Sequence, residues 1–116
     1  MTLPEFARWF AAQRRVCSYC HIPEELVASL GLSTQTGERL QRLGLDRIDG
    51  EKPYSVDNIV LCCFACNKAK SNTVSTDEMY GIGKSYGDVW EKRLAAAGQL
   101  WQRCPGYRSP RRTTSC

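Results

Sequence analysis

Histidine is almost absent from this chain of 116 residues, which contains His21 and no other. The chain also lacks any apolar run of roughly 18 residues, the length that a membrane-spanning helix needs, so we expect no membrane partner. Its first residues, Met1 to Glu5, have neither the basic nor the apolar stretch of a secretory signal. We therefore expect a cytoplasmic, intracellular protein.

Features of a disulfide-bonded secreted protein are missing as well. The seven cysteines form an odd number, and disulfides persist mainly in oxidising compartments that a secretory signal gives access to. With 42% hydrophobic and 24% charged residues, the composition excludes wholesale disorder and is that of a globular protein. The cysteines of such a chain point to metal binding.

The net charge of +4 comes entirely from the C-terminal end. Residues 1–101 hold twelve basic and twelve acidic residues, whereas 103–116 hold four arginines and no acid. We expect a single domain over 1–102 followed by a flexible basic tail over 103–116, which also carries Cys104 and Cys116. The tail either adds salt-sensitive affinity for phosphates or only aids solubility.

Local patterns predict a mixed α+β domain. An aromatic stripe, Phe6, Trp9 and Phe10, has helical spacing and is expected to face the core. The β-branched run from Ile59 to Cys62 is typical of a buried strand. In chain order we expect a helix over 4–15, a short helix over 23–30, a strand over 38–48, a strand over 59–62, a helix over 66–71, a helix start at 76–79 and a final helix over 88–102.

Two C-x-x-C pairs, Cys17 with Cys20 and Cys63 with Cys66, have the spacing of zinc knuckles. Such a turn brings two thiolates to one ion, and two turns complete a tetrahedral shell with no open position. We therefore expect a structural zinc ion, with redox-active or buried free thiols as the alternative. Cys62 could replace Cys63, although its spacing to Cys66 is less suitable.

Between these pairs, several segments together resemble the HNH endonuclease family, also known as ββα-metal or His-Me finger nucleases. They are Leu45–Gly50, Tyr54, Asp57–Leu61 and Cys63–Ser71, which occur in the family's order. The resemblance covers residues 17 to about 75. It implies a small ββα-metal finger stapled by the four-cysteine zinc site and flanked by N- and C-terminal helices.

The resemblance also implies a site that hydrolyses phosphodiester bonds. Asp46 and Asn67 match the ligands of a catalytic divalent ion, for which Mg²⁺ or Mn²⁺ suits the oxygen donors. Asn58 matches the asparagine that orients the site, while Lys68 and Lys70 would face the phosphates of nucleic acid. Taken singly, each of these residues also fits a purely structural role.

One residue departs from the family pattern. Arg47 stands where the family has its general-base histidine, and an arginine with a pKa above about 12 cannot accept a proton at neutral pH. Arg47 can instead hold a phosphate and stabilise the transition state. In His-lacking variants of this fold a tyrosine is thought to replace the histidine, and the candidates here are Tyr54, Tyr80, Tyr19 and His21.

The sequence thus supports a divalent-metal-dependent DNA endonuclease from a phage, mobile-element or restriction context. The alternative is a non-catalytic, zinc-stabilised module of the same fold that binds nucleic acid. A zinc protein that binds another protein would require only the cysteine pairs. A homodimer would be a natural way to cut both strands of DNA.

Overall fold

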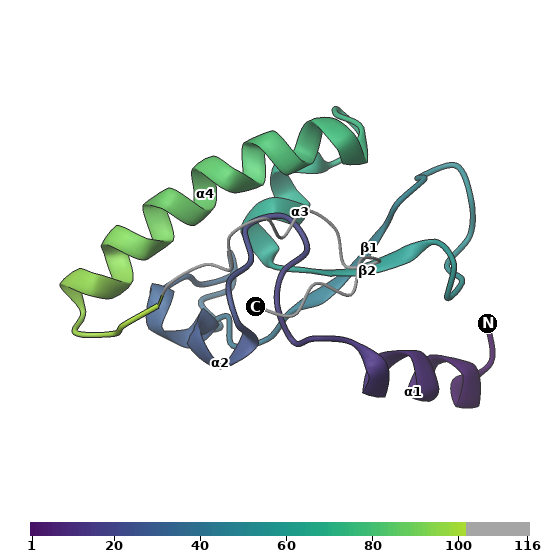
Figure 1. The fold of residues 1–116 in the computed structure, drawn as a ribbon, viewed down its shortest axis with the longest axis horizontal. Coiled ribbons are helices and arrows are strands. Elements are labelled where there is room, and N and C mark those ends of the chain that lie inside the picture. The colour runs from purple at the N-terminus through teal and green to yellow at the C-terminus, as the bar shows by residue number, and fades with distance from the viewer. Residues whose placement is uncertain (102–116) are drawn as a thin grey trace.

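The structure, a computed structural model, describes residues 1–101 (Figure 1). The tail expected over 103–116 therefore lies outside the described residues, as do Cys104 and Cys116. In chain order the elements are α1 (Leu3–Ala12), α2 (Glu24–Val27), η1 (Ala28–Leu30), β1 (Gly44–Arg47), β2 (Ile59–Cys62), α3 (Phe64–Lys70) and α4 (Thr76–Ala96). Among residues 1–101, no helix has both the length and the apolar composition needed to cross a membrane.

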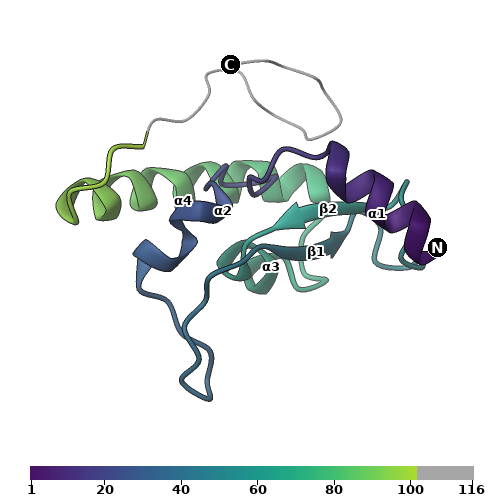
Figure 2. The ribbon, with the colours of Figure 1, turned by 90° about the horizontal axis from the view of Figure 1, so that it is seen from below.

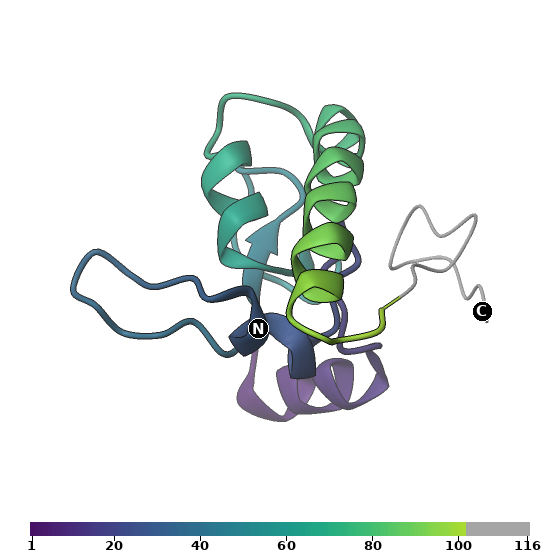
Figure 3. The same cartoon turned by 90° about the vertical axis from the view of Figure 1, so that its left-hand side faces the viewer.

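A small antiparallel sheet pairs β1 with β2, with Gly44 opposite Cys62 and Arg47 opposite Ile59. Every residue of β2 is buried, which confirms the strand predicted over 59–62. The strand predicted over 38–48 was too long, because β2 offers only four positions for pairing. The preceding residues instead form a loop that projects from the body (Figures 2 and 3).

The helix that follows β2 begins at Phe64, two residues earlier than predicted, because Cys63 caps its N-terminus. The chain then continues into α4, one helix of 21 residues where two separate helices were predicted. Ser75 and Glu78 form a capping box that starts α4. The helix ends at Ala96 rather than Gln102, and α3 and α4 lie side by side (Figure 3).

The core lies between the turn Cys17–Cys20, the sheet and α4. The aromatic stripe of α1 does not belong to it: in the described part of the chain no residue of α1 is buried. Phe6, Trp9 and Phe10 are half-buried and contact one another, with ring centroids 5.6 to 6.0 Å apart. The prediction that this stripe faces the core was wrong, because α1 extends along one edge of the molecule (Figure 1).

Contact between α4 and the turn Cys17–Cys20 requires a glycine. A Cβ atom on Gly83 would lie 2.5 Å from the backbone carbonyl carbon and oxygen of Tyr19, which is far inside van der Waals contact. Gly81, two residues before it on the same helix, has open space around the corresponding position among the described residues. The absence of a side chain at Gly83 therefore lets the helix pack directly against Tyr19.

We predict opposite effects of two alanine substitutions in α4. Gly83→Ala should lower the free energy of unfolding by about 1–3 kcal/mol, because the helix must move away from Tyr19. Gly81→Ala should raise it by about 0.5–1 kcal/mol, because alanine loses less backbone entropy in a helix. Urea unfolding followed by circular dichroism measures both values, and a Gly83→Ala protein as stable as the wild type would contradict the packing described.

Candidate functional site

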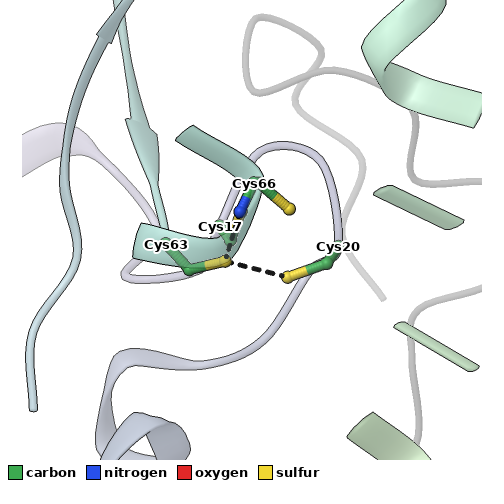
Figure 4. Close-up of side chains that lie close together, drawn as sticks. All are labelled: Cys17, Cys20, Cys63 and Cys66. Carbon is green, nitrogen blue, oxygen red and sulfur yellow. Dashed lines mark hydrogen bonds between the residues drawn. The ribbon is translucent and has the colours of Figure 1, made fainter. Parts of the chain in front are cut away.

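Four cysteines from two distant turns meet in one buried cluster (Figure 4). The Sγ atoms of Cys17, Cys20, Cys63 and Cys66 all lie within 4.8 Å of one another, and Cys20 Sγ is 3.6 Å from Cys63 Sγ. Zinc–sulfur bonds of about 2.3 Å in a tetrahedron place sulfur atoms roughly 3.8 Å apart. The cysteine cluster therefore has the size needed to hold one tetrahedral ion.

Backbone hydrogen bonds hold the two turns in place. Ser18 donates its amide to the carbonyl of Leu61 in β2 at 2.9 Å, which ties the first turn to the sheet. The amide of Cys66 donates to Cys63 Sγ at 3.5 Å, so the same sulfur belongs to the cluster and caps α3. Cys62 is buried next to the cluster, but its thiol donates to the Cys63 carbonyl at 3.3 Å.

The thiols of the cluster cannot all ionise without a compensating cation. Burial by itself raises the pKa of Cys17, but hydrogen bonds from the neighbouring thiols bring it well below its ordinary value. Burial and the hydrogen bonds with Cys17 and Cys63 raise the pKa of Cys20. One thiolate is thus favoured at the expense of its neighbours, and four thiolates together require a bound metal ion.

A pair of adjacent cysteines tests which thiols hold the ion. Cys63→Ala should abolish stoichiometric zinc binding and lower the melting temperature, because metal binding and folding are coupled in such sites. The matched control, Cys62→Ala, should retain one zinc ion per chain. Metal analysis of both purified proteins distinguishes the two residues, and retention of zinc by Cys63→Ala would assign the ligand to Cys62.

An open pocket of about 380 Å³ lies between β1, the loop that follows it and α3. Most of the residues predicted to act on nucleic acid line this pocket together. They are Asp46 and Arg47 from β1, Tyr54 from the loop, and Asn67, Lys68 and Lys70 from α3. The pocket lining thus includes one carboxylate, two side-chain amides and three cationic side chains.

Asn58 is the predicted site residue that does not line the pocket. Its Oδ1 accepts from the Asp49 amide at 2.9 Å, and its Nδ2 donates to the carbonyls of Asp49, Lys52 and Pro53 at 3.0 to 3.3 Å. Asn58 therefore closes the loop that carries Tyr54. Its contacts are with the backbone of that loop.

The side chain of Arg47 contacts the same loop. Its Nη1 donates to the Lys52 carbonyl at 3.3 Å, and its guanidinium lies 5.2 Å from the ring centroid of Tyr54. A guanidinium close to an aromatic ring gains a modest electrostatic attraction. Arg47 and Tyr54 are thus held next to each other at the pocket.

The carboxylate of Asp46 is largely buried and takes part in two short contacts. Its Oδ2 accepts from the Tyr19 hydroxyl at 2.7 Å and lies 3.0 Å from Lys70 Nζ. Lys70 Nζ also donates to the Arg47 carbonyl at 2.7 Å. Lys70 is only 7% exposed, so in this structure its charge is directed at Asp46 and β1, and the contact with phosphate remains a prediction.

The four candidates for proton transfer lie in different places. Tyr54 is 51% exposed and, of the four, is the one that lines the pocket. Burial, and then the hydrogen bond to Asp46, raise the pKa of Tyr19, which therefore keeps its proton. The ring of Tyr80 packs against that of Tyr19 at 5.2 Å, and His21 lies in the first turn with a φ of 69°.

Two further residues line the pocket although the sequence analysis did not predict them as site residues. Phe64, 39% exposed, begins α3, and its ring lies 5.7 Å from Lys68 Nζ. Asn72 adopts a left-handed φ of 63° after α3, and its Oδ1 lies 2.9 Å from where a Cβ on Gly50 would be. A Ser-Asn pair after a lysine-rich helix is a usable signal for such a left-handed ending.

Two lysines of α3 should respond differently to loss of charge. Lys70→Met should lower the free energy of unfolding by about 3 kcal/mol, because it leaves the buried Asp46 carboxylate without its cation. Lys68→Met, at an exposed position of the same helix, should change it by less than about 0.5 kcal/mol. Urea unfolding at neutral pH measures both, and equal stabilities would contradict the importance of the buried pair.

Comparison with known proteins gives one clear relative. No family model and no curated protein matches the chain. Among solved structures, the rare-cutting HNH restriction endonuclease PacI superposes with a TM-score of 0.73 at 37% sequence identity. The match covers 80% of this chain and 66% of the PacI chain. Because this likeness combines 37% identity with a close superposition over 80% of the chain, the chain belongs to the HNH endonuclease family.

Proposed function

We propose that this protein is a divalent-metal-dependent DNA endonuclease that hydrolyses phosphodiester bonds. The observation that carries the proposal is the meeting of Asp46 and Asn67 in one pocket with Arg47, Lys68 and Tyr54. These residues come from three separate segments, β1, the loop that follows it and α3, and they line one open pocket. Phosphodiester hydrolysis needs oxygen ligands, cations and a proton acceptor in one place.

Asp46 and Asn67 would hold the catalytic ion. Their carboxylate and amide oxygens are the donors that Mg²⁺ or Mn²⁺ prefers, and both line the pocket. Such an ion supplies charge stabilisation to the phosphate and to the departing oxygen. Asn58 contributes indirectly, by closing the loop that brings Tyr54 to the pocket.

Arg47 and Lys68 would bind the phosphate on either side of the attacked bond. The guanidinium of Arg47 offers paired N–H donors, and the exposed ammonium of Lys68 adds a point charge. Tyr54 would take the role of the absent histidine, since it is the one of the four candidates that lines the pocket. In its phenolate form Tyr54 would accept a proton from the attacking water as that oxygen bonds to phosphorus, and the opposite P–O bond would break to release the departing oxygen.

The relative supports a proposal on the biological context. PacI is described as a rare-cutting restriction endonuclease that perturbs DNA. We infer a restriction role for this chain too, with DNA as the substrate. A homodimer would present two pockets to the two strands of a symmetric site. The cysteine cluster would hold zinc, because soft thiolate ligands in a closed tetrahedral set favour that ion.

Cleavage of supercoiled plasmid tests the proposal. With Mg²⁺ or Mn²⁺ the wild type should nick or cut, and EDTA should stop it. Asp46→Ala and Asn67→Ala should each lower the rate at least about 100-fold while zinc content stays unchanged. Tyr54→Phe should lose about 100-fold or more, whereas Tyr86→Phe, far along α4, should keep wild-type activity. Robust cutting by Asp46→Ala would reject this assignment of the site.

A second candidate is a zinc-stabilised module that binds DNA without cutting it. Two observations favour it: Arg47 cannot act as a base, and Lys70 Nζ already lies 3.0 Å from Asp46. This candidate predicts DNA binding that weakens steeply with salt but no cleavage with any divalent ion. The same plasmid assay, combined with a salt titration of binding, distinguishes it from the endonuclease.

A further inference from the structure

Tyr19 connects the cysteine cluster to the pocket. It lies between Cys17 and Cys20, is 1% exposed, and donates its hydroxyl to Asp46 Oδ2 at 2.7 Å. The two residues are 27 positions apart in the chain. Tyr19, which lies between two cysteines of the proposed zinc site, therefore contacts the carboxylate that we propose as a ligand of the catalytic ion.

One oxygen of Asp46 receives both contacts. Lys70 Nζ, from α3, lies 3.0 Å from the same Oδ2 that accepts from Tyr19, and it is anchored to the Arg47 carbonyl at 2.7 Å. Among residues 1–101, neither contact uses Oδ1. Two donors from two elements restrict rotation of the carboxylate, and they leave its other oxygen free to bind a cation.

Tyr19 itself has little freedom to move. The amide of the preceding Ser18 donates to Leu61 in β2 at 2.9 Å, and the Tyr19 backbone packs directly against Gly83 of α4. The ring contacts that of Tyr80 at 5.2 Å. The hydroxyl is therefore placed by the same turn that supplies two of the four thiols.

We propose that Tyr19 is a positioning residue for the divalent-ion site: with Lys70 it holds one oxygen of Asp46, so that the cysteine cluster sets the affinity of the pocket for its cation. This inference rests on the proposed function only in that Asp46 binds a divalent ion. It assigns to Tyr19 a role other than proton transfer. Removal of a hydrogen-bond partner behind a metal ligand typically costs about 10- to 100-fold in metal affinity.

The test compares Mn²⁺ binding by zinc-loaded, full-length proteins. Tyr19→Phe keeps the ring and the cysteines but removes the hydroxyl, and we expect its Kd for Mn²⁺ to rise about 10-fold or more. Tyr86→Phe is the matched control, since its ring stacks on Trp90 at 5.5 Å in α4, and it should bind like the wild type. Free Mn²⁺ is measured by electron paramagnetic resonance, and zinc content is measured in parallel.

Plasmid cleavage by the same samples separates this inference from the proposed function. A Tyr19→Phe protein that retains zinc and binds Mn²⁺ within about twofold of the wild type overturns the inference, even if the wild type cuts DNA. Wild-type protein that binds Mn²⁺ but does not cut overturns the endonuclease, and the Kd values still decide the role of Tyr19. No difference between wild type and Asp46→Asn in Mn²⁺ binding overturns both.

A second measurement leaves Tyr19 unchanged, in case Tyr19→Phe loses zinc. Magnesium is titrated into the zinc-loaded, ¹⁵N-labelled protein, and the amide signals of residues 17–20 are followed by nuclear magnetic resonance. We expect them to shift together with those of Asp46 and Asn67, and to stay still in Asp46→Asn. Signals of 17–20 that do not move while Asp46 and Asn67 respond would overturn the inference.

Discussion

The meeting of two cysteine pairs is the contact on which the rest of this structure depends. It joins turns that lie 43 residues apart, measured from Cys20 to Cys63. The second pair also sets where α3 begins, because Cys63 caps the helix that carries Asn67. A domain with a two-stranded sheet has a thin core, and a metal ion held by the four cysteines would compensate for the missing apolar contacts.

The cysteine cluster also organises the chemistry of the pocket. Through Tyr19 it reaches the Asp46 carboxylate, and through α3 it places Lys70 against the same oxygen. The pocket thus has a rigid wall, built on buried contacts, and a second wall formed by the loop that carries Tyr54. Asn58 gives that loop its shape through hydrogen bonds to three carbonyls. In the proposed endonuclease, the buried wall would hold the ion in place while the loop would leave room for a large substrate.

Local patterns predicted the elements whose signals are contained within a few residues. The apolar run Ile59–Cys62 is a buried strand, and the turn before Glu24 starts a short helix, as expected. Predictions failed where an element depends on a distant partner. The first strand is only as long as its partner strand. Helix α4 continues through Gly83, where it packs against Tyr19, and the α1 aromatics lie outside the core.

The sequence by itself determined the two cysteine pairs, the family resemblance and most residues of the pocket, because spacing and residue type are local properties of the chain. Only the tertiary structure decided which tyrosine lines the pocket and which one supports Asp46 from behind. It also decided that Lys70 pairs with Asp46. The contacts of Tyr19 and Lys70 with Asp46 join residues more than twenty positions apart. Their partners depend on how the turns, sheet and helices pack around the cysteine cluster.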